Sequence, residues 1–189
     1  MAKKNVYAEI KIKARLSFVQ LFEAREYGGK KQYSVALLIP HGNKNAVKTI
    51  TDGIKKAIEL GKDKYGWEDG IEKGKQFFTP LDDGDSKPKY VGYPGNYYMN
   101  TKNMMKPVCI DLDGEPLTPE ELYSGCWANC IVHLIPYEHT SGGKGVLASI
   151  QGVQKYKDDE LFGGTGEVVL EDNAFSSDFG DDGEGGFLG

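Results

Sequence analysis

The sequence predicts a mainly β protein with one main helix, an OB-fold-like antiparallel β-barrel followed by a disordered acidic C-terminal tail. The first observation is a residue-by-residue alternation of apolar and polar side chains that begins at Val6. The second is a series of five or six strand-like segments separated by turn signals, without the alternating strand–helix pattern of a parallel sheet. The third is that residues 158–189 hold ten of the 28 acidic residues and none of the 23 lysines and arginines. We therefore expect a barrel domain over residues 1–157 and a flexible tail over residues 158–189.

The first predicted strand has one buried and one polar face. The face predicted to be buried carries Val6, Ala8, Ile10, Ile12, Ala14, Leu16 and Phe18. The opposite face carries Tyr7, Glu9, Lys11, Lys13, Arg15 and Ser17. Gly28 and Gly29 predict a turn, after which residues 32–39 form a second, more apolar strand that ends at Pro40.

One helix is expected after the second strand. Asn43 is a suitable N-terminal cap, and the helix is expected to run to about Leu60 with Gly61 as its stop. One stripe of this helix is apolar, which predicts that it packs on the sheet through Val47, Ile50, Ile54, Ala57 and Ile58. Residues 62–89 are polar and rich in Gly, Asp and Lys. A segment of this length is functional or contains further structure.

The remaining strands are shorter or aromatic. Strands are expected over residues 90–103 (broken at 94–95), 107–112, 126–137 and 146–156. Asp113-Gly114 predicts a turn, and Thr118-Pro119-Glu120-Glu121 has the form of a capping box, which predicts one helical turn. The last two strands form a hairpin across a Gly-rich loop. The tail has too few branched apolar residues to offset the entropy of ordering.

Several properties limit the compartment and the class of protein. The chain has no apolar run long enough to cross a membrane, and its N-terminal residues do not form a signal peptide. Cys109, Cys126 and Cys130 are an odd number of cysteines, which cannot all pair and so favour a reducing, intracellular environment. We expect the cytoplasm.

Basic and aromatic side chains alternate on the predicted outward faces and around the first turn. Cations neutralise phosphates, and flat rings stack on bases at about 1–3 kcal/mol each, so this mixture predicts binding of single-stranded nucleic acid. The alternative is that these charges only solvate the strands while the rings complete the core. The residues expected to contact DNA are Lys11, Lys13, Arg15, Arg25, Lys31, Tyr33, Lys89, Tyr93, Tyr98, Lys102, Trp127 and Tyr137.

The acidic tail is expected to act as a competing polyanion. It can fold back onto the basic surface, and when DNA displaces it, its apolar residues become free to bind partner proteins. The alternative is a tail that only increases solubility. The residues expected to bind partners are Asp178, Phe179, Asp181, Asp182, Glu184 and Phe187.

Metal and catalytic sites are weaker interpretations. Cys109, Cys126, Cys130 and His133 provide zinc-ligand types, but on a strand His133 points away from Cys126 and Cys130, so free cysteines are favoured. The carboxylates Asp82, Asp83, Asp85, Asp111 and Asp113 lie beside glycines, where Asp typically supports turns. No cofactor motif or nucleophile–base arrangement is present. We expect no metal, no cofactor and no catalysis.

Segments spread over most of the chain resemble a known family, the phage-encoded OB-fold single-stranded DNA-binding proteins, formerly a phage domain of unknown function. The similar segments are 14–18, 21–24, 33–40, 80–85, 92–93, 123–127, 143–146 and 151–154, and the acidic tail is similar in character.

The resemblance implies a barrel that coats single strands without catalysis during phage replication or recombination, in the cytoplasm of a bacterial host. It also implies a tail that restrains DNA binding and recruits replication or recombination proteins. A homodimer is a further expectation. Two other functions stay open, namely a Mg²⁺-dependent nuclease that uses Asp82, Asp83, Asp85 or Asp111 and a protein-only adaptor.

Overall fold

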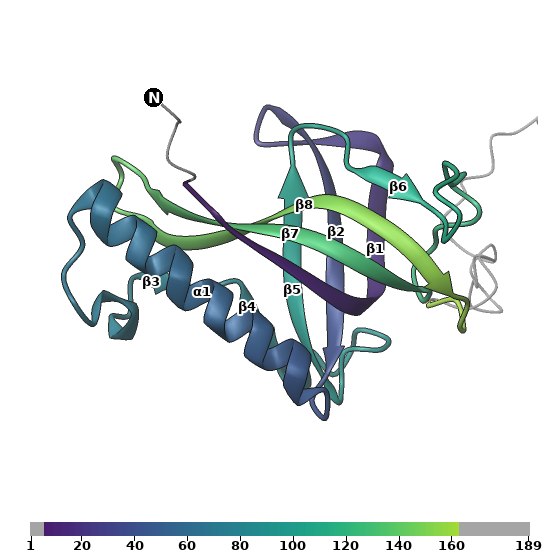
Figure 1. Cartoon of the computed structure of the whole chain (residues 1–189), viewed down its shortest axis with the longest axis horizontal. Helices are drawn as coiled ribbons and strands as arrows, with labels where there is room; N and C mark the ends of the chain where they lie inside the picture. Colours follow the sequence, from purple (N-terminus) through teal and green to yellow (C-terminus); the bar gives the residue numbers. More distant parts are fainter. Residues whose placement is uncertain (1–5, 163–189) are drawn as a thin grey trace, which may run out of the picture.

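A computed structural model describes residues 6–162 as a strongly curved β-sheet with one long helix against it (Figure 1). The long strands are β1 (Ala8–Tyr27), β2 (Lys30–Pro40), β5 (Asn96–Asn103), β7 (Trp127–Glu138) and β8 (Lys144–Lys157). The short strands are β3 (Phe77–Phe78), β4 (Leu81–Asp83) and β6 (Val108–Ile110). The helix is α1 (Lys44–Tyr65), and two 3-10 turns cover Ile71–Lys73 and Gly84–Ser86.

Strand β1 organises the sheet because it pairs with two neighbours in succession. Its first half pairs antiparallel with β7, ending at Arg15 opposite Trp127. From Arg15 onward it pairs antiparallel with β2, so the strand curls from one side of the sheet to the other. The strand order is β3-β8-β7-β1-β2-β5-β4, with β6 joined to β8.

The barrel is open between β5 and β8, which approach each other but do not form a ladder. The Asn103 side-chain amide donates a hydrogen bond across this gap to the Ile150 carbonyl at 2.7 Å. The order of the five long strands, with one open seam, is that of a partly open OB barrel. The predicted fold class is therefore confirmed, and the structure adds that the sheet is unclosed.

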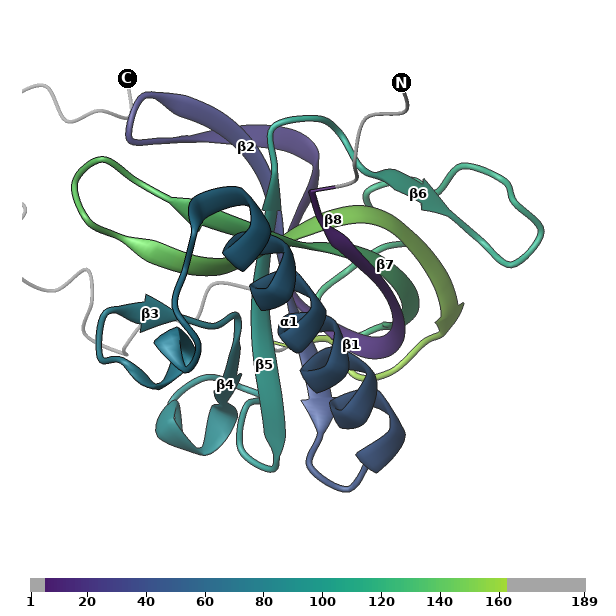
Figure 2. The same ribbon diagram turned by 60° about the vertical axis from the view of Figure 1, so that its left-hand side comes forward.

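Alternating residues of the long strands face inward and form the core. Leu16, Leu37, Val132, Leu134 and Ile150 are all fully buried there. Helix α1 packs mainly on β1 and β7 (Figure 2). The helix lies so close to β1 that position 53 has room only for glycine, because a Cβ added at Gly53 would lie 2.6 Å from Ile10 Cγ2.

The helix begins as predicted but ends later. The Asn43 side chain accepts a hydrogen bond from the Ala46 N–H at 3.2 Å, which satisfies one free donor of the first turn. The expected stop at Gly61 is wrong, because the helix continues to Gly66, which caps it with φ of 71°. Gly61 instead makes room for Trp67, since an added Cβ would lie 2.1 Å from that ring.

Residues 62–89 contain structure instead of one long loop. The helix occupies the first four of them, and Trp67 is only 7% exposed. Strand β3 then pairs in parallel with β8, and β4 pairs antiparallel with β5. The glycines and aspartates that suggested a loop serve the turns between these short elements.

The turns and the last hairpin follow the sequence expectations. Gly28 and Gly29 both have positive φ and connect β1 to β2. The Thr118 N–H donates to the Glu121 carboxylate at 2.7 Å, and the Leu122 N–H donates to the Thr118 carbonyl, which makes one turn. Strands β7 and β8 form the predicted hairpin.

One residue of β1 lies on the wrong face for its predicted role. Phe18 was expected in the core, but it is 56% exposed. The register between β1 and β2 shifts between Ser17 and Gln20, so a β-bulge interrupts the alternation at this point.

Candidate nucleic-acid interface

The outer face of β1, β2 and β5 bears a row of polar side chains that continues into an open groove. This groove has a volume of about 580 Å³ and reaches across the open seam to Leu147 and Ala148 of β8. In OB folds the corresponding strands and the loops beside them bind oligonucleotides. The rings and polar side chains lining the groove come from Phe18, Tyr27, Gln32, Ser34, Asn100 and Lys102.

Four of the predicted contact residues come from the strands that form this groove, and Lys102 lines it. Arg25 pairs with Gln32 near the β1–β2 turn, and Lys31 is exposed on the same hairpin. Lys102 of β5 lines the groove and pairs with Ser34 of β2, whereas Tyr33 pairs with Asn103 and so lies on the opposite face of the sheet. The groove thus combines rings, amides and hydroxyls with a rim of cations, which suits a flexible strand with stacked bases.

A second basic cluster lies on the outer face where β1 meets β7. Lys11, Lys13 and Arg15 pair with Ile131, Asn129 and Trp127 in register. The Lys13 ammonium lies 4.8 Å from the centre of the Tyr156 ring, within the range of a cation–π contact. Lys11, Lys13 and Arg15 therefore share one surface with Trp127.

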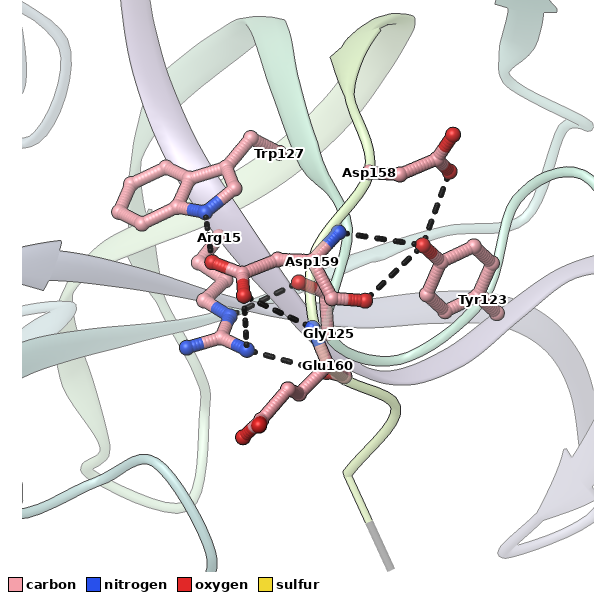
Figure 3. A network of polar contacts seen from close by, with 7 residues as sticks. All are labelled: Arg15, Tyr123, Gly125, Trp127, Asp158, Asp159 and Glu160. Carbon is pink, nitrogen blue, oxygen red and sulfur yellow. Dashed lines mark hydrogen bonds and ion pairs between the residues drawn. The ribbon is translucent and has the colours of Figure 1, made fainter. Parts of the chain in front are cut away.

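Arg15 is the centre of this cluster, and the start of the acidic segment covers it. We define the strap as residues 158–162. Arg15 Nε donates to the Gly125 carbonyl at 2.8 Å, and Arg15 Nη2 donates to the Glu160 carbonyl of the strap at 3.0 Å (Figure 3). The Arg15 guanidinium also lies 4.3 Å from the centre of the Phe162 ring.

The strap places a carboxylate where a phosphate would suit the basic cluster. Trp127 Nε1 donates to Asp159 Oδ2 at 2.8 Å, and Arg15 Nη2 lies 3.5 Å from Asp159 Oδ1 (Figure 3). The hydrogen bond from Trp127 is the largest cause that lowers the Asp159 pKa, and the charge of Arg15 adds to it. The Tyr123 hydroxyl donates to Asp158 and holds the beginning of the strap.

The last strap residue packs against two of the predicted contact residues. Tyr93 and Tyr98 are only 2% and 8% exposed, in a small cluster with Ala36 and Leu38, and Phe162 packs against this cluster. Burial raises the pKa of Tyr93 above its ordinary value. The interpretation of Tyr93 and Tyr98 as outward-facing rings is therefore corrected, since neither presents an open face here.

Two glycines leave the space in which the strap lies. Gly125 has φ of 121°, and an added Cβ would lie 2.0 Å from the Glu160 carbonyl oxygen. Gly92 has φ of 83°, and an added Cβ would lie 2.3 Å from the Phe162 ring. The strap is thus closely fitted to the surface at Glu160 and at Phe162.

The other predicted contact residues lie apart from each other. Lys89 is exposed in the turn before β5, next to Tyr90, whose ring contacts Phe18 at the groove. Tyr137 is on the outer face of β7, ten residues beyond Trp127, with its ring 5.1 Å from His139. At about 3.3 Å per residue, Tyr137 lies some 30 Å along the strand from the Arg15 cluster. The predicted tail contacts Asp178, Phe179, Asp181, Asp182, Glu184 and Phe187 lie outside the described residues.

The candidate metal ligands are separated by the fold. Cys126 and Cys130 are buried in the core, while His133 is on the outer face, stacked on Tyr7 with Nε2 3.0 Å from Glu9. Burial raises the pKa of Cys130 and raises that of Cys109 to about 11. These thiols are therefore protonated near neutral pH, unlike metal ligands.

The carboxylates mostly support turns. Asp111 accepts hydrogen bonds from the N–H groups of Asp113 and Glu115, as its sequence context predicts. Within residues 6–162, the ligand atoms of His41, Asp83 and Asp85 lie within 4.8 Å of one another. Asp83 accepts from the Asp85 N–H and Asp85 from the Gly95 N–H, so both carboxylates cap the local backbone.

Helix α1 is too polar to cross a membrane, and within residues 6–162 the structure has no helix that qualifies as a span. The strand order and the groove on the outer face place the protein in the OB-type class, an architecture whose members include oligonucleotide-binding proteins. A sequence model described as "Enterobacter phage Enc34, ssDNA-binding protein" matches residues 8–184. The chain belongs to this family of phage single-stranded DNA-binding proteins.

Individual relatives agree with this assignment. "Putative protein p50" of Acyrthosiphon pisum secondary endosymbiont phage 1 is 37% identical over 168 residues, covering 84% of this chain and 88% of the relative. The single-stranded DNA-binding protein of bacteriophage Enc34, solved in complex with ssDNA, is 29% identical with a TM-score of 0.65. That match covers 86% of this chain and 97% of the Enc34 chain.

A more distant solved structure shares the fold alone. It is gp2.5, a single-stranded DNA-binding protein encoded by bacteriophage T7, with 14% identity and a TM-score of 0.52. The match covers 93% of this chain and 98% of the T7 protein. The family is not enzymatic, which removes the nuclease interpretation of the carboxylates.

Proposed function

We propose that this protein binds single-stranded DNA without strong sequence preference and protects it during phage DNA replication and recombination. The observation that carries the proposal is the groove on β2 and β5, which is lined by the exposed rings of Phe18 and Tyr27 and by Lys102. Every base offers a flat face to a ring, so such a groove binds strands of any sequence. The solved Enc34 complex with ssDNA supports the same ligand class.

The direct test is a fluorescence titration with an oligo-dT strand and a matched duplex at several salt concentrations. We expect tight, salt-sensitive binding of the strand and much weaker binding of the duplex. Arg25→Ala and Lys102→Ala should each lower the slope of log affinity against log salt by about 0.7, the value for one phosphate contact on a single strand. Lys56→Ala, on the exposed side of α1, is the matched control. Absence of binding to either DNA would favour the adaptor hypothesis.

The strap supports a second part of the proposal, in which the acidic C-terminal segment competes with DNA. Asp159 offers a carboxylate to Arg15 and Trp127, while Phe162 offers a ring to Arg15 and the tyrosine cluster. These are the two chemical groups, anion and flat ring, that a nucleotide would present to the same surface. Strand binding at Arg15 would then require the strap to leave.

We further propose that the acidic segment beyond the strap recruits replication or recombination proteins once DNA has displaced it. The charge pattern of residues 163–189, with Phe187 and Leu188 near the end, supports this role. The test compares the full chain with a variant ending at residue 162. Only the full chain should co-purify with polymerase or recombinase of the phage, and equal recovery would contradict the proposal.

The proposal also includes a bacterial cytoplasmic location and a homodimer. Analytical ultracentrifugation over a range of protein concentrations tests the dimer. A mass near 20.8 kDa at all concentrations would show a monomer and overturn this part. Immunogold labelling of infected cells tests the location.

A further inference from the structure

Phe18 has a backbone conformation that its side chain disfavours. Its φ is 50°, and among residues 6–162 it is the only residue other than glycine with a positive φ. A bulky residue in this region costs about 1–3 kcal/mol, whereas glycine adopts it freely. Such strain persists only where the surrounding structure imposes it, and it concentrates at functional sites.

The strain is a consequence of the β-bulge in β1. Ser17 pairs with Ala36 and Gln20 with Ser34, so β1 uses one residue more than β2 over the same distance. Val19 packs against the core, and its N–H donates to the Ser124 hydroxyl instead of to β2. The bulge therefore lets Val19 face the core and turns the Phe18 ring outward.

The outward ring is held in place but left accessible. It contacts Tyr90 at 5.5 Å and Tyr93 at 6.2 Å between ring centres, both in edge-to-face geometry. More than half of the side chain stays exposed, and it lines the groove together with Asn100 and Lys102. A strained, exposed phenylalanine contributes little to stability, so folding alone does not account for it.

We propose that Phe18 is a base-stacking residue of this groove, supported from behind by Tyr90 and Tyr93. The inference rests on the proposed function, because it assigns a contact within the same groove. The bulge positions the ring, and the two tyrosines restrict its rotation. Lys102 lines the same groove and would provide a cation for a neighbouring phosphate. The entropy of fixing the ring is thus already lost before DNA binds.

Two substitutions at Phe18 separate binding from folding. Phe18→Gly removes the ring and relieves the backbone strain, so the thermal midpoint should change by less than about 5 °C. The Kd for oligo-dT should rise about 5- to 150-fold, the equivalent of one lost base stack, and the salt slope should not change. Phe18→Trp should bind at least as tightly as wild type. Leu112→Ala, which changes a similarly exposed apolar side chain two residues beyond the end of β6, is the matched control.

A third variant and a chemical probe keep the test decisive. Phe18→Leu keeps an apolar contact without a flat ring, so it should bind nearly as weakly as Phe18→Gly. A strand carrying 5-iodouracil should cross-link to Phe18 under ultraviolet light. Wild-type binding by Phe18→Gly or Phe18→Leu, or cross-links only elsewhere, would overturn the inference. A wild-type protein that binds no strand at all would instead overturn the proposed function.

Discussion

Removing the Phe162 ring is the sharpest way to test whether the strap competes with DNA. Phe162 packs on the buried tyrosine cluster, and its ring lies 4.3 Å from the Arg15 guanidinium. The variant Phe162→Ala deletes both contacts, while the backbone hydrogen bond from the Phe162 N–H to the Ser124 carbonyl is kept. The substitution neither adds nor removes a charge, so a gain in DNA affinity would come from release of the strap.

The two contacts of Phe162 set the free energy that the substitution removes from the docked strap. Half-burying a phenylalanine side chain contributes about 1–1.5 kcal/mol. A partly exposed cation–π contact contributes about 0.5–1 kcal/mol. Phe162→Ala should therefore weaken the docked strap by about 2 kcal/mol, which sets an upper limit of about 30-fold on the gain in DNA affinity.

The assay is fluorescence anisotropy with a labelled oligo-dT strand at low and moderate salt. We expect Phe162→Ala to bind more tightly than wild type, by a factor between about 3 and 30. Leu161→Ala is the matched control, because Leu161 is the adjacent exposed residue. Binding by Phe162→Ala within twofold of wild type at low salt would refute the competition mechanism. A thermal unfolding curve verifies that the variant remains folded.

Three other predictions concern the fold itself. Gly61→Ala should lower the free energy of unfolding by about 1–3 kcal/mol in urea titrations, because its Cβ would overlap the Trp67 ring; unchanged stability would mean that Trp67 can move. Because burial raises the pKa of Cys109 to about 11 and also raises that of Cys130, both thiols stay protonated at pH 8. Ellman's reagent should therefore react slowly with the native protein and rapidly in guanidinium, and rapid native reaction would contradict this. Leu37→Ala should cost about 2–5 kcal/mol in the same urea assay, since Leu37 is fully buried, and a smaller loss would indicate repacking.

Local patterns in the sequence were sufficient for much of the fold. The alternation from Ala8 to Leu16 predicted β1 correctly, because a strand with one buried face must repeat every two residues. Asn43 predicted the start of the helix through a hydrogen bond that spans only three residues. In both cases the deciding contacts lie close together in the chain.

The errors came from contacts between distant parts of the chain. A bulge at Phe18 adds one residue on β1 relative to β2, and single-strand alternation carries no sign of it. Gly61 suited a helix stop, yet the space beside it is needed by Trp67. Tyr98 lies on the outer strand face as predicted, but Phe162, 64 positions later in the sequence, packs against its cluster.

The position of the strap at the candidate site also depends on contacts between residues that are distant in the chain. Residues 158–162 belong to the acidic segment by composition, and their charge alone predicted a flexible tail. In the structure they lie against Arg15 and Trp127, because Gly92 and Gly125 leave space for them. The sequence predicted which charges would attract each other, but the fitted path depends on two glycines that are 33 residues apart.

The two tryptophans lie in different surroundings, so the intrinsic fluorescence of one of them reports on the strap. Trp67 is buried against the helix, and its indole N–H has no hydrogen-bond partner within residues 6–162. Trp127 is the opposite case, because its indole N–H donates to Asp159 of the strap. Undocking of the strap would change the surroundings of Trp127 and leave those of Trp67 as they are. In a Trp67→Phe variant, the tryptophan emission would therefore report on the contact between Trp127 and Asp159 alone. Stopped-flow mixing of this variant with DNA would show whether the strap leaves before or after the strand binds.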